Sequence, residues 1–186
     1  MHVWTIQPPE VLKILEKEGK FTCNPELSDK DFTKAYEWMA NQMDAKGIEH
    51  PENLKLPIWA WYRYDWKNKK PDLRHSMGVK GMNYMCIELE VPDSHVLLSD
   101  YNAWHYVLND MWNDPSKNEE EYDALQDWYD GLDVDTKNKT KIESWQRIFD
   151  IEPYEDMWNM NGRYVQATFW EITEDMVKKV QTFISK

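Results

Sequence analysis

Strand-like segments that lie far apart in the sequence constrain the fold of this chain most. Residues 58–64, 83–91 and 165–172 are rich in β-branched and aromatic residues, and residues 3–7 and 96–98 are shorter segments of the same kind. Few of these segments are joined by a hairpin turn, so the sheet must be assembled from distant parts of the chain. We therefore expect an α+β fold: a small, mixed, mainly antiparallel sheet of about five strands, flanked by amphipathic helices.

Helices are predicted between and after these strands. One helix is expected to begin at Pro9 and to be ended by Gly19, and a second to begin after Ser28 and to be ended by Gly47, because apolar side chains follow helical spacing in both segments. A third helix is expected to begin after Ser99 or Asp100, either of which is a good N-cap. From Thr173 onward the apolar residues again fit helical spacing, which predicts a last helix. Its stripe consists of Met176, Val177, Val180, Phe183 and Ile184.

Composition indicates a folded, acidic chain. The 186 residues include 11 Trp, 10 Tyr and 5 Phe, which exclude a disordered chain despite a net charge of −12. The length fits a single domain spanning residues 1–186, from which the acidic segment 113–141 is expected to depart as a surface helix or loop. Lys and Arg do not cluster over a broad part of the chain, so we do not expect an extended surface that binds the phosphate backbone of a nucleic acid. No apolar stretch approaches a membrane span or a leader, so we expect a cytoplasmic protein without membrane contact.

Motifs of the common enzyme classes are missing. The sequence contains no Gly-x-Gly-x-x-Gly, no phosphate-binding loop, no His-Glu-x-x-His and no Gly-x-Ser-x-Gly. Cys23, Cys86 and the five histidines show no metal-ligand spacing, so we expect no metal site. Glu88 and Glu90 share one strand face, a pattern that fits a metal pair but is more typical of a solvated sheet face.

An aromatic run is followed by basic residues. Trp59, Trp61, Tyr62, Tyr64 and Trp66 precede Lys67, Lys69, Lys70 and Arg74. This combination is typical of a site that stacks a base or nicotinamide ring and holds its phosphates. Strand spacing equally fits a core position for Trp59 and Trp61, and both interpretations stay open.

Several motifs together resemble an uncharacterised bacterial and phage family, catalogued as domain of unknown function thirty-eight forty-one. The resemblance covers nearly the whole chain. Its motifs are Val3 to Gly19, Pro57-Ile-Trp-Ala-Trp61, Trp104-His105, Ser144-Trp-x-Arg-Ile-Phe-Asp150 and Gln166-Ala-Thr-Phe-Trp-Glu171.

The first strand, the following Val-Leu-x-x-Leu-x-x-x-Gly helix and the late Gln-Ala-x-Phe strand are also similar to small ADP-ribosyltransferases. This resemblance implies NAD as the cosubstrate and a macromolecular acceptor, protein or nucleic acid. The resemblance implies that Thr5 or Gln7 contacts the NAD ribose. It also implies that Trp61 or Tyr62 packs against the nicotinamide ring.

The same resemblance gives the catalytic acid role to Gln166, Thr168 or Glu171. The usual acid position falls on Thr168, so Glu171 serves only if a register shift or bulge brings it into the cleft. There Glu171 would stabilise the oxocarbenium-like state, while Arg63 or Arg74 would clamp the pyrophosphate.

Two hypotheses without catalysis remain. Residues 113–135 carry nine carboxylates and one lysine, so this segment would capture a basic host protein, as a phage or mobile-element inhibitor would. Alternatively, Trp59 and Trp61 form a cage for a modified base or small ligand. The enzyme hypothesis requires the residues that hold NAD and Glu171 to converge on one cleft, whereas the inhibitor hypothesis depends on residues 113–135.

Overall fold

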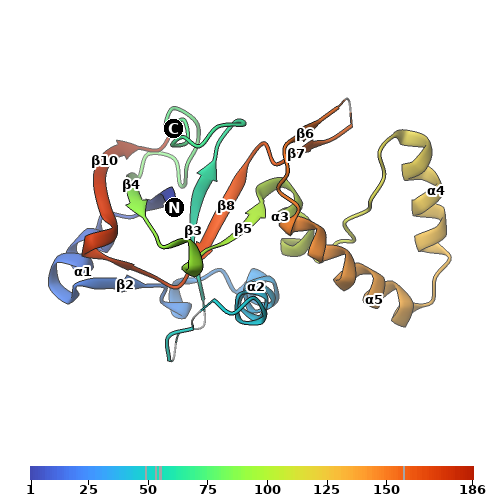
Figure 1. The fold of residues 1–186 in the computed structure, drawn as a ribbon, viewed down its shortest axis with the longest axis horizontal. Helices are drawn as coiled ribbons and strands as arrows, with labels where there is room; N and C mark the ends of the chain where they lie inside the picture. The colour runs from blue at the N-terminus through green and yellow to red at the C-terminus, as the bar shows by residue number, and fades with distance from the viewer. Residues whose placement is uncertain (49, 53, 55, 157) are drawn as a thin grey trace.

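A six-stranded open sheet organises the chain. The computed structural model describes residues 1–48, 50–52, 54, 56–156 and 158–186. Its strand order is β10-β4-β1-β3-β8-β5, and every neighbouring pair is antiparallel (Figure 1). The expected α+β fold is confirmed, with six strands in the main sheet. The strands are β1 (His2–Gln7), β3 (Ile58–Arg63), β4 (Asn83–Glu90), β5 (Leu97–Asp100), β8 (Val165–Phe169) and β10 (Val177–Ile184).

Helices and two small two-stranded sheets complete the fold. The helices are α1 (Glu10–Glu18), α2 (Thr33–Ala45), α3 (Tyr101–Leu108), α4 (Glu119–Asp130) and α5 (Val134–Ser144). The small sheets pair β2 (Lys20–Thr22) with β9 (Glu171–Thr173), and β6 (Tyr154–Glu155) with β7 (Met160–Asn161). Single 3₁₀ turns are η1 (Pro25–Leu27), η2 (Lys30–Phe32), η3 (Asp93–His95), η4 (Trp145–Phe149) and η5 (Glu174–Met176).

Two hydrophobic cores stabilise the sheet. The first packs Val11 and Leu15 of α1 against buried strand residues such as Val3 and Ile87. The second packs α2, α3 and η4 together through a separate set of side chains, among them Met39, Trp104, Trp145 and Ile148. Since side chains alternate across a strand, the sheet presents apolar residues on both faces.

The expected C-terminal helix is wrong. Residues Val177–Ile184 form β10, which pairs with β4 along its length. The register shifts between Val177 and Lys179, so a bulge interrupts the period of two and leaves the apolar residues at spacings that also suit a helix. The expected strand 165–172 is also divided, because Trp170 separates β8 from β9, and β9 pairs with β2.

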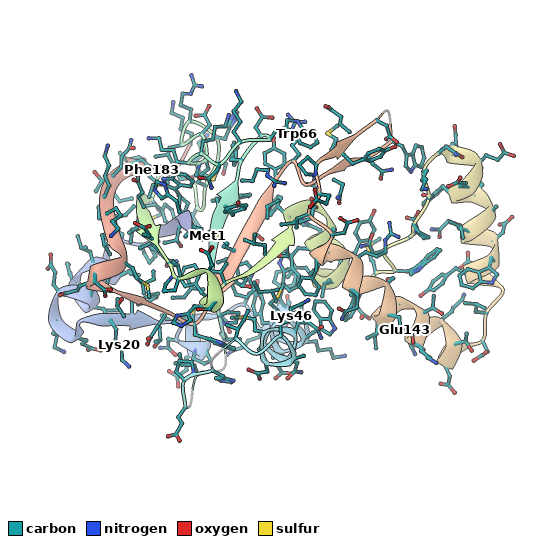
Figure 2. The ribbon with its side chains drawn as sticks, viewed as in Figure 1. Met1, Lys20, Lys46, Trp66, Glu143 and Phe183 are labelled. Atoms are coloured by element: carbon teal, nitrogen blue, oxygen red, sulfur yellow. The ribbon has the colours of Figure 1, made fainter. Side chains whose placement is uncertain are left out.

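Residues 113–141, which we call the arm, project from the sheet (Figure 1). Helices α4 and α5 form most of the arm and bury no residue. Trp112 holds the base of the arm by stacking on Tyr129 at 4.4 Å between ring centroids, and Lys141 pairs with Asp110 at 2.7 Å. Figure 2 shows side chains of both helices pointing into the space between them and others pointing outward.

None of the helices in the described part of the chain has the length and apolar character needed to cross a bilayer.

Candidate functional site

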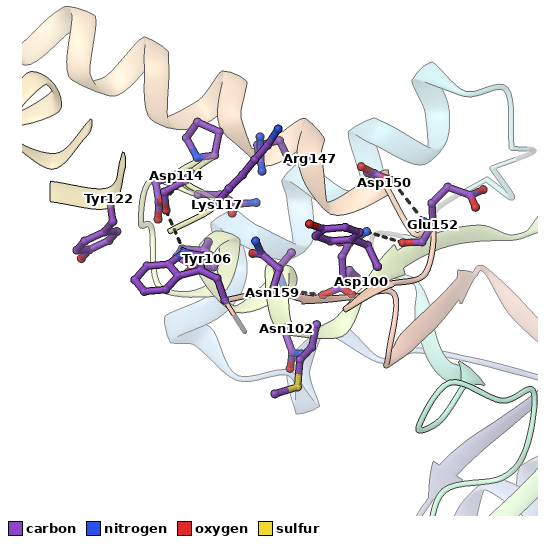
Figure 3. Close-up of a pocket in the computed structure, with 18 residues that line it drawn as sticks. Asp100, Asn102, Tyr106, Asp114, Lys117, Tyr122, Arg147, Asp150, Glu152 and Asn159 are labelled. Atoms are coloured by element: carbon purple, nitrogen blue, oxygen red, sulfur yellow. Dashed lines mark hydrogen bonds between the residues drawn. The ribbon is translucent and has the colours of Figure 1, made fainter. Parts of the chain in front are cut away.

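A pocket of about 670 Å³ lies between α3, η4, the β6–β7 hairpin and the start of the arm (Figure 3). We call it the arm pocket. Its volume is in the range of small-molecule sites. In Figure 3, Tyr122 lies at one end of the pocket and Glu152 at the other.

Two cationic side chains line the arm pocket. Arg147 belongs to η4. Two other residues of this turn, Trp145 and Ile148, are buried in the second core and fix the turn, whereas Arg147 is exposed. Lys117 lies in the arm just before α4, and its backbone N–H donates to a carboxylate oxygen of Glu121 at 2.9 Å. Among the described residues, neither cation forms an ion pair. Both are therefore available for an anionic ligand.

Aromatic side chains line the same pocket as these cations. The rings of Tyr122 and Trp158 are 6.1 Å apart, and Trp158 Nε1 donates to Ser116 Oγ at 3.3 Å. Tyr106 also lines the pocket. Burial raises the pKa of Tyr106, with Asp114 and Tyr122 acting in the same direction and Arg147 in the opposite one. Exposed aromatic faces beside free cations suit a ligand with a planar ring and a phosphate group.

A buried carboxylate forms the floor of the pocket. Asp100 is 2% exposed and accepts hydrogen bonds from the backbone N–H groups of Ala103 and Gly162, each at 2.8 Å. Burial raises the pKa of Asp100, while these backbone bonds and nearby Arg63 act against the rise. The bond to Ala103 caps α3, as the sequence suggested for Asp100 or Ser99. Its hydrogen bonds make Asp100 chiefly a positioning residue.

Further carboxylates, Asp150 and Glu152, line the pocket and are exposed. A group of three or more His, Cys, Asp and Glu side chains that would hold a metal ion does not occur within the described residues. The cations, the aromatic rings and the carboxylates of the arm pocket together suit a ligand that carries both an anionic group and a planar ring.

The structure brings some of the residues predicted from the sequence into pairs. Gln7 Nε2 donates to Thr5 Oγ1 at 2.8 Å, and the fully buried Thr5 donates to the carbonyl of Trp59. Tyr62 packs against the core on that face of the sheet.

Trp61 and Gln166 lie directly opposite each other on neighbouring strands. Trp61 packs against Tyr101 at 4.9 Å, and Gln166 lies opposite Ser99 on its other side. Gln166 Oε1 and Ser99 Oγ are buried without a hydrogen-bond partner among the described residues. Trp59 packs against the second core.

The remaining predicted residues lie elsewhere. Arg74 is 82% exposed and pairs with Asp72 at 2.6 Å in the loop between β3 and β4. Glu171 belongs to β9, lies 3.8 Å from Lys20 and lines a second pocket of about 410 Å³ with His50 and Trp170. Arg63 is occupied, because its Nη1 donates to the carbonyls of Ile151 and Gly162.

None of the site residues predicted from the sequence lines the arm pocket. Sequence reasoning missed Arg147, Lys117 and Trp158, which come from different elements and share no spacing. Two signals in the sequence pointed to this region: Arg147 and Asp150 lie in the Ser144–Asp150 motif of the family resemblance, and the acidic segment was expected to depart from the core.

The chain matches a family model described as Domain of unknown function (DUF3841), over residues 2–178. The family resemblance expected from the motifs is thereby confirmed. No curated protein and no solved structure matches the chain. The similarity to ADP-ribosyltransferases stays a prediction.

Proposed function

The chain belongs to the domain-of-unknown-function family DUF3841, whose description names no activity, and we propose that it binds NAD in the arm pocket and acts as an ADP-ribosyltransferase-like protein on a macromolecular acceptor. One observation carries the proposal: Arg147 and Lys117 face the pocket without an ion-pair partner among the described residues, beside the rings of Tyr122 and Trp158. The cations suit the pyrophosphate, and the rings suit a stacked base.

The proposed reaction needs only NAD, the acceptor and a carboxylate of the pocket. The bond between ribose C1′ and the nicotinamide nitrogen breaks, and neutral nicotinamide leaves with the bonding electrons. A nucleophilic atom of the acceptor bonds to C1′ and releases its proton. Asp150 or Glu152 would stabilise the positive charge that develops on the ribose and accept that proton. This assignment replaces Glu171 as the candidate acid, because Glu171 lies outside the arm pocket.

The test is a titration with NAD, followed by calorimetry and by nicotinamide release. We expect Arg147→Ala to weaken NAD binding about 10-fold or more, the loss typical of one charge-assisted hydrogen bond. Arg74→Ala is the matched control, since this arginine is exposed and paired with Asp72, and it should bind NAD like the wild type.

Two outcomes would contradict the proposal. If Glu171→Gln abolishes nicotinamide release while Arg147→Ala retains binding and turnover, the site lies near β9. If the wild type does not bind NAD at saturating concentration, the enzyme proposal is wrong.

A second candidate function is the capture of a basic protein by the arm. Two features of α4 favour this function. The helix has no buried residue, and the segment that contains it is strongly negative. A polylysine peptide should bind the wild type and dissociate as salt rises. Neutralising Glu120, Asp123 and Asp127 should weaken this binding more than neutralising Glu16, Glu18 and Glu37 on other helices.

A further inference from the structure

An asparagine that is largely buried lines the arm pocket with its side-chain amide unpaired within the described part of the chain. Asn113 lines the pocket and is 7% exposed. Its backbone N–H donates to Ser144 Oγ at 3.0 Å, but its side-chain amide has no hydrogen bond to any described residue. The nitrogen and oxygen of this amide stay accessible although the residue as a whole is almost fully buried, so the amide is free to pair with a group that the pocket receives.

The backbone on both sides of Asn113 is held in place. Trp112 stacks on Tyr129, and Asp114 accepts hydrogen bonds from both the backbone N–H and the hydroxyl of Ser116. The bond to Ser144 attaches the same point to the end of α5. The backbone that carries the amide is therefore fixed before a ligand arrives, which lowers the entropic cost of recognition.

We infer that Asn113 selects the ligand of the arm pocket by pairing with a planar group that presents a donor and an acceptor side by side. An asparagine amide offers one acceptor oxygen and a donor nitrogen in one plane, so it complements such a group with two hydrogen bonds. In NAD, the nicotinamide carboxamide and the amino edge of adenine both have this arrangement. The inference rests on the proposed function and adds the residue that selects among possible ligands of the arm pocket.

The experiment compares three probes on the wild type and Asn113→Ala: NAD, ADP-ribose and the dinucleotide whose carboxamide is replaced by a carboxylate. We expect Asn113→Ala to weaken NAD binding about 10-fold or more. If ADP-ribose binding is unchanged by the substitution, the recognised group is the carboxamide, and the wild type should also discriminate against the carboxylate analogue. If NAD and ADP-ribose lose affinity equally, the recognised group is the adenine edge.

Asn138→Ala is the matched control, because Asn138 is an exposed asparagine of α5 that does not line the pocket, and this variant should bind NAD like the wild type. If Asn113→Ala does not fold, Asn113→Asp keeps the size of the side chain but removes the paired donor, and it should lose NAD affinity in the same way. NAD binding that depends on Arg147 but not on Asn113 would overturn the inference and leave the proposed function standing. A wild type that binds none of the probes would overturn both.

Discussion

Gly162 holds the floor of the arm pocket through its backbone. Its φ is +71°, and a Cβ at this position would lie 2.5 Å from the carbonyl oxygen of Ile151 and 2.9 Å from Nη1 of Arg63. Its N–H donates to the buried carboxylate of Asp100. The left-handed conformation and the close approach both require glycine here.

We predict that Gly162→Ala lowers the free energy of unfolding by at least about 2 kcal/mol, because an alanine is strained at this φ and displaces the neighbouring carbonyl. Urea denaturation measures the change. Gly131→Ala is the control: its φ is −76° and its added Cβ would make only ordinary contacts at 3.5 Å, so its stability should stay equal or rise slightly. Equal effects at the two positions would contradict the argument.

The two thiols provide a prediction about pH. Burial raises the pKa of Cys23 and of Cys86 to about 11, from an ordinary value of 9.0. At pH 8 both should react slowly with a disulfide reagent in the folded protein and rapidly in guanidinium, since the thiolate is the reactive form. Because the unfolded chain ionises first, these thiols should also lower stability as pH rises from 9 towards 11. Fast reaction of the native protein at pH 8 would show that the thiols are accessible.

At the scale of elements, the strands and helices that the sequence predicts best are those with clear ends. Gly19 ends α1 as expected, with a left-handed φ of +72°, while Pro9 is the N-cap, so the helix begins at Glu10, one residue after the expected start. The central strands β3 and β4 also lie within the segments 58–64 and 83–91 in which the sequence predicts strands. In these segments the local pattern and the tertiary contacts agree.

The elements that the sequence misassigned depend on contacts with distant partners. A bulge in β10 gives its apolar residues a helical spacing, and only pairing with β4 reveals a strand. The candidate site was hidden for a related reason. Asn113, Arg147 and Trp158 meet because three separate turns converge beside α3, and no spacing in the sequence records that convergence.

At the scale of the whole molecule, the arm is an insertion whose two ends lie together. The backbone N–H of Asn113 and the hydroxyl of Ser144 are 3.0 Å apart, although 30 residues separate them in the sequence. Neither α4 nor α5 contributes a buried residue. The sheet and its two cores therefore depend little on the arm.

We predict that replacing residues 116–139 with a short Gly-Ser linker leaves a cooperatively folded protein. Its free energy of unfolding should fall by about 2–3 kcal/mol, because Trp112 loses its stack on Tyr129 and becomes exposed. Circular dichroism should show less helix, and NAD binding should disappear with Lys117 and Tyr122. Loss of the cooperative transition would show that the arm is needed for the sheet to fold.

The strand order has a consequence for how the chain is made. Strand β5, at residues 97–100, has β8 at residues 165–169 as its neighbour in the main sheet, and β10 adds to β4 only after that. During synthesis, β5 and the helix that follows it therefore wait for nearly seventy further residues before they can join the sheet. With such distant pairings, folding should be slow and should finish only after β10 has left the ribosome. Until then, apolar strand edges stay open to chaperones and to aggregation.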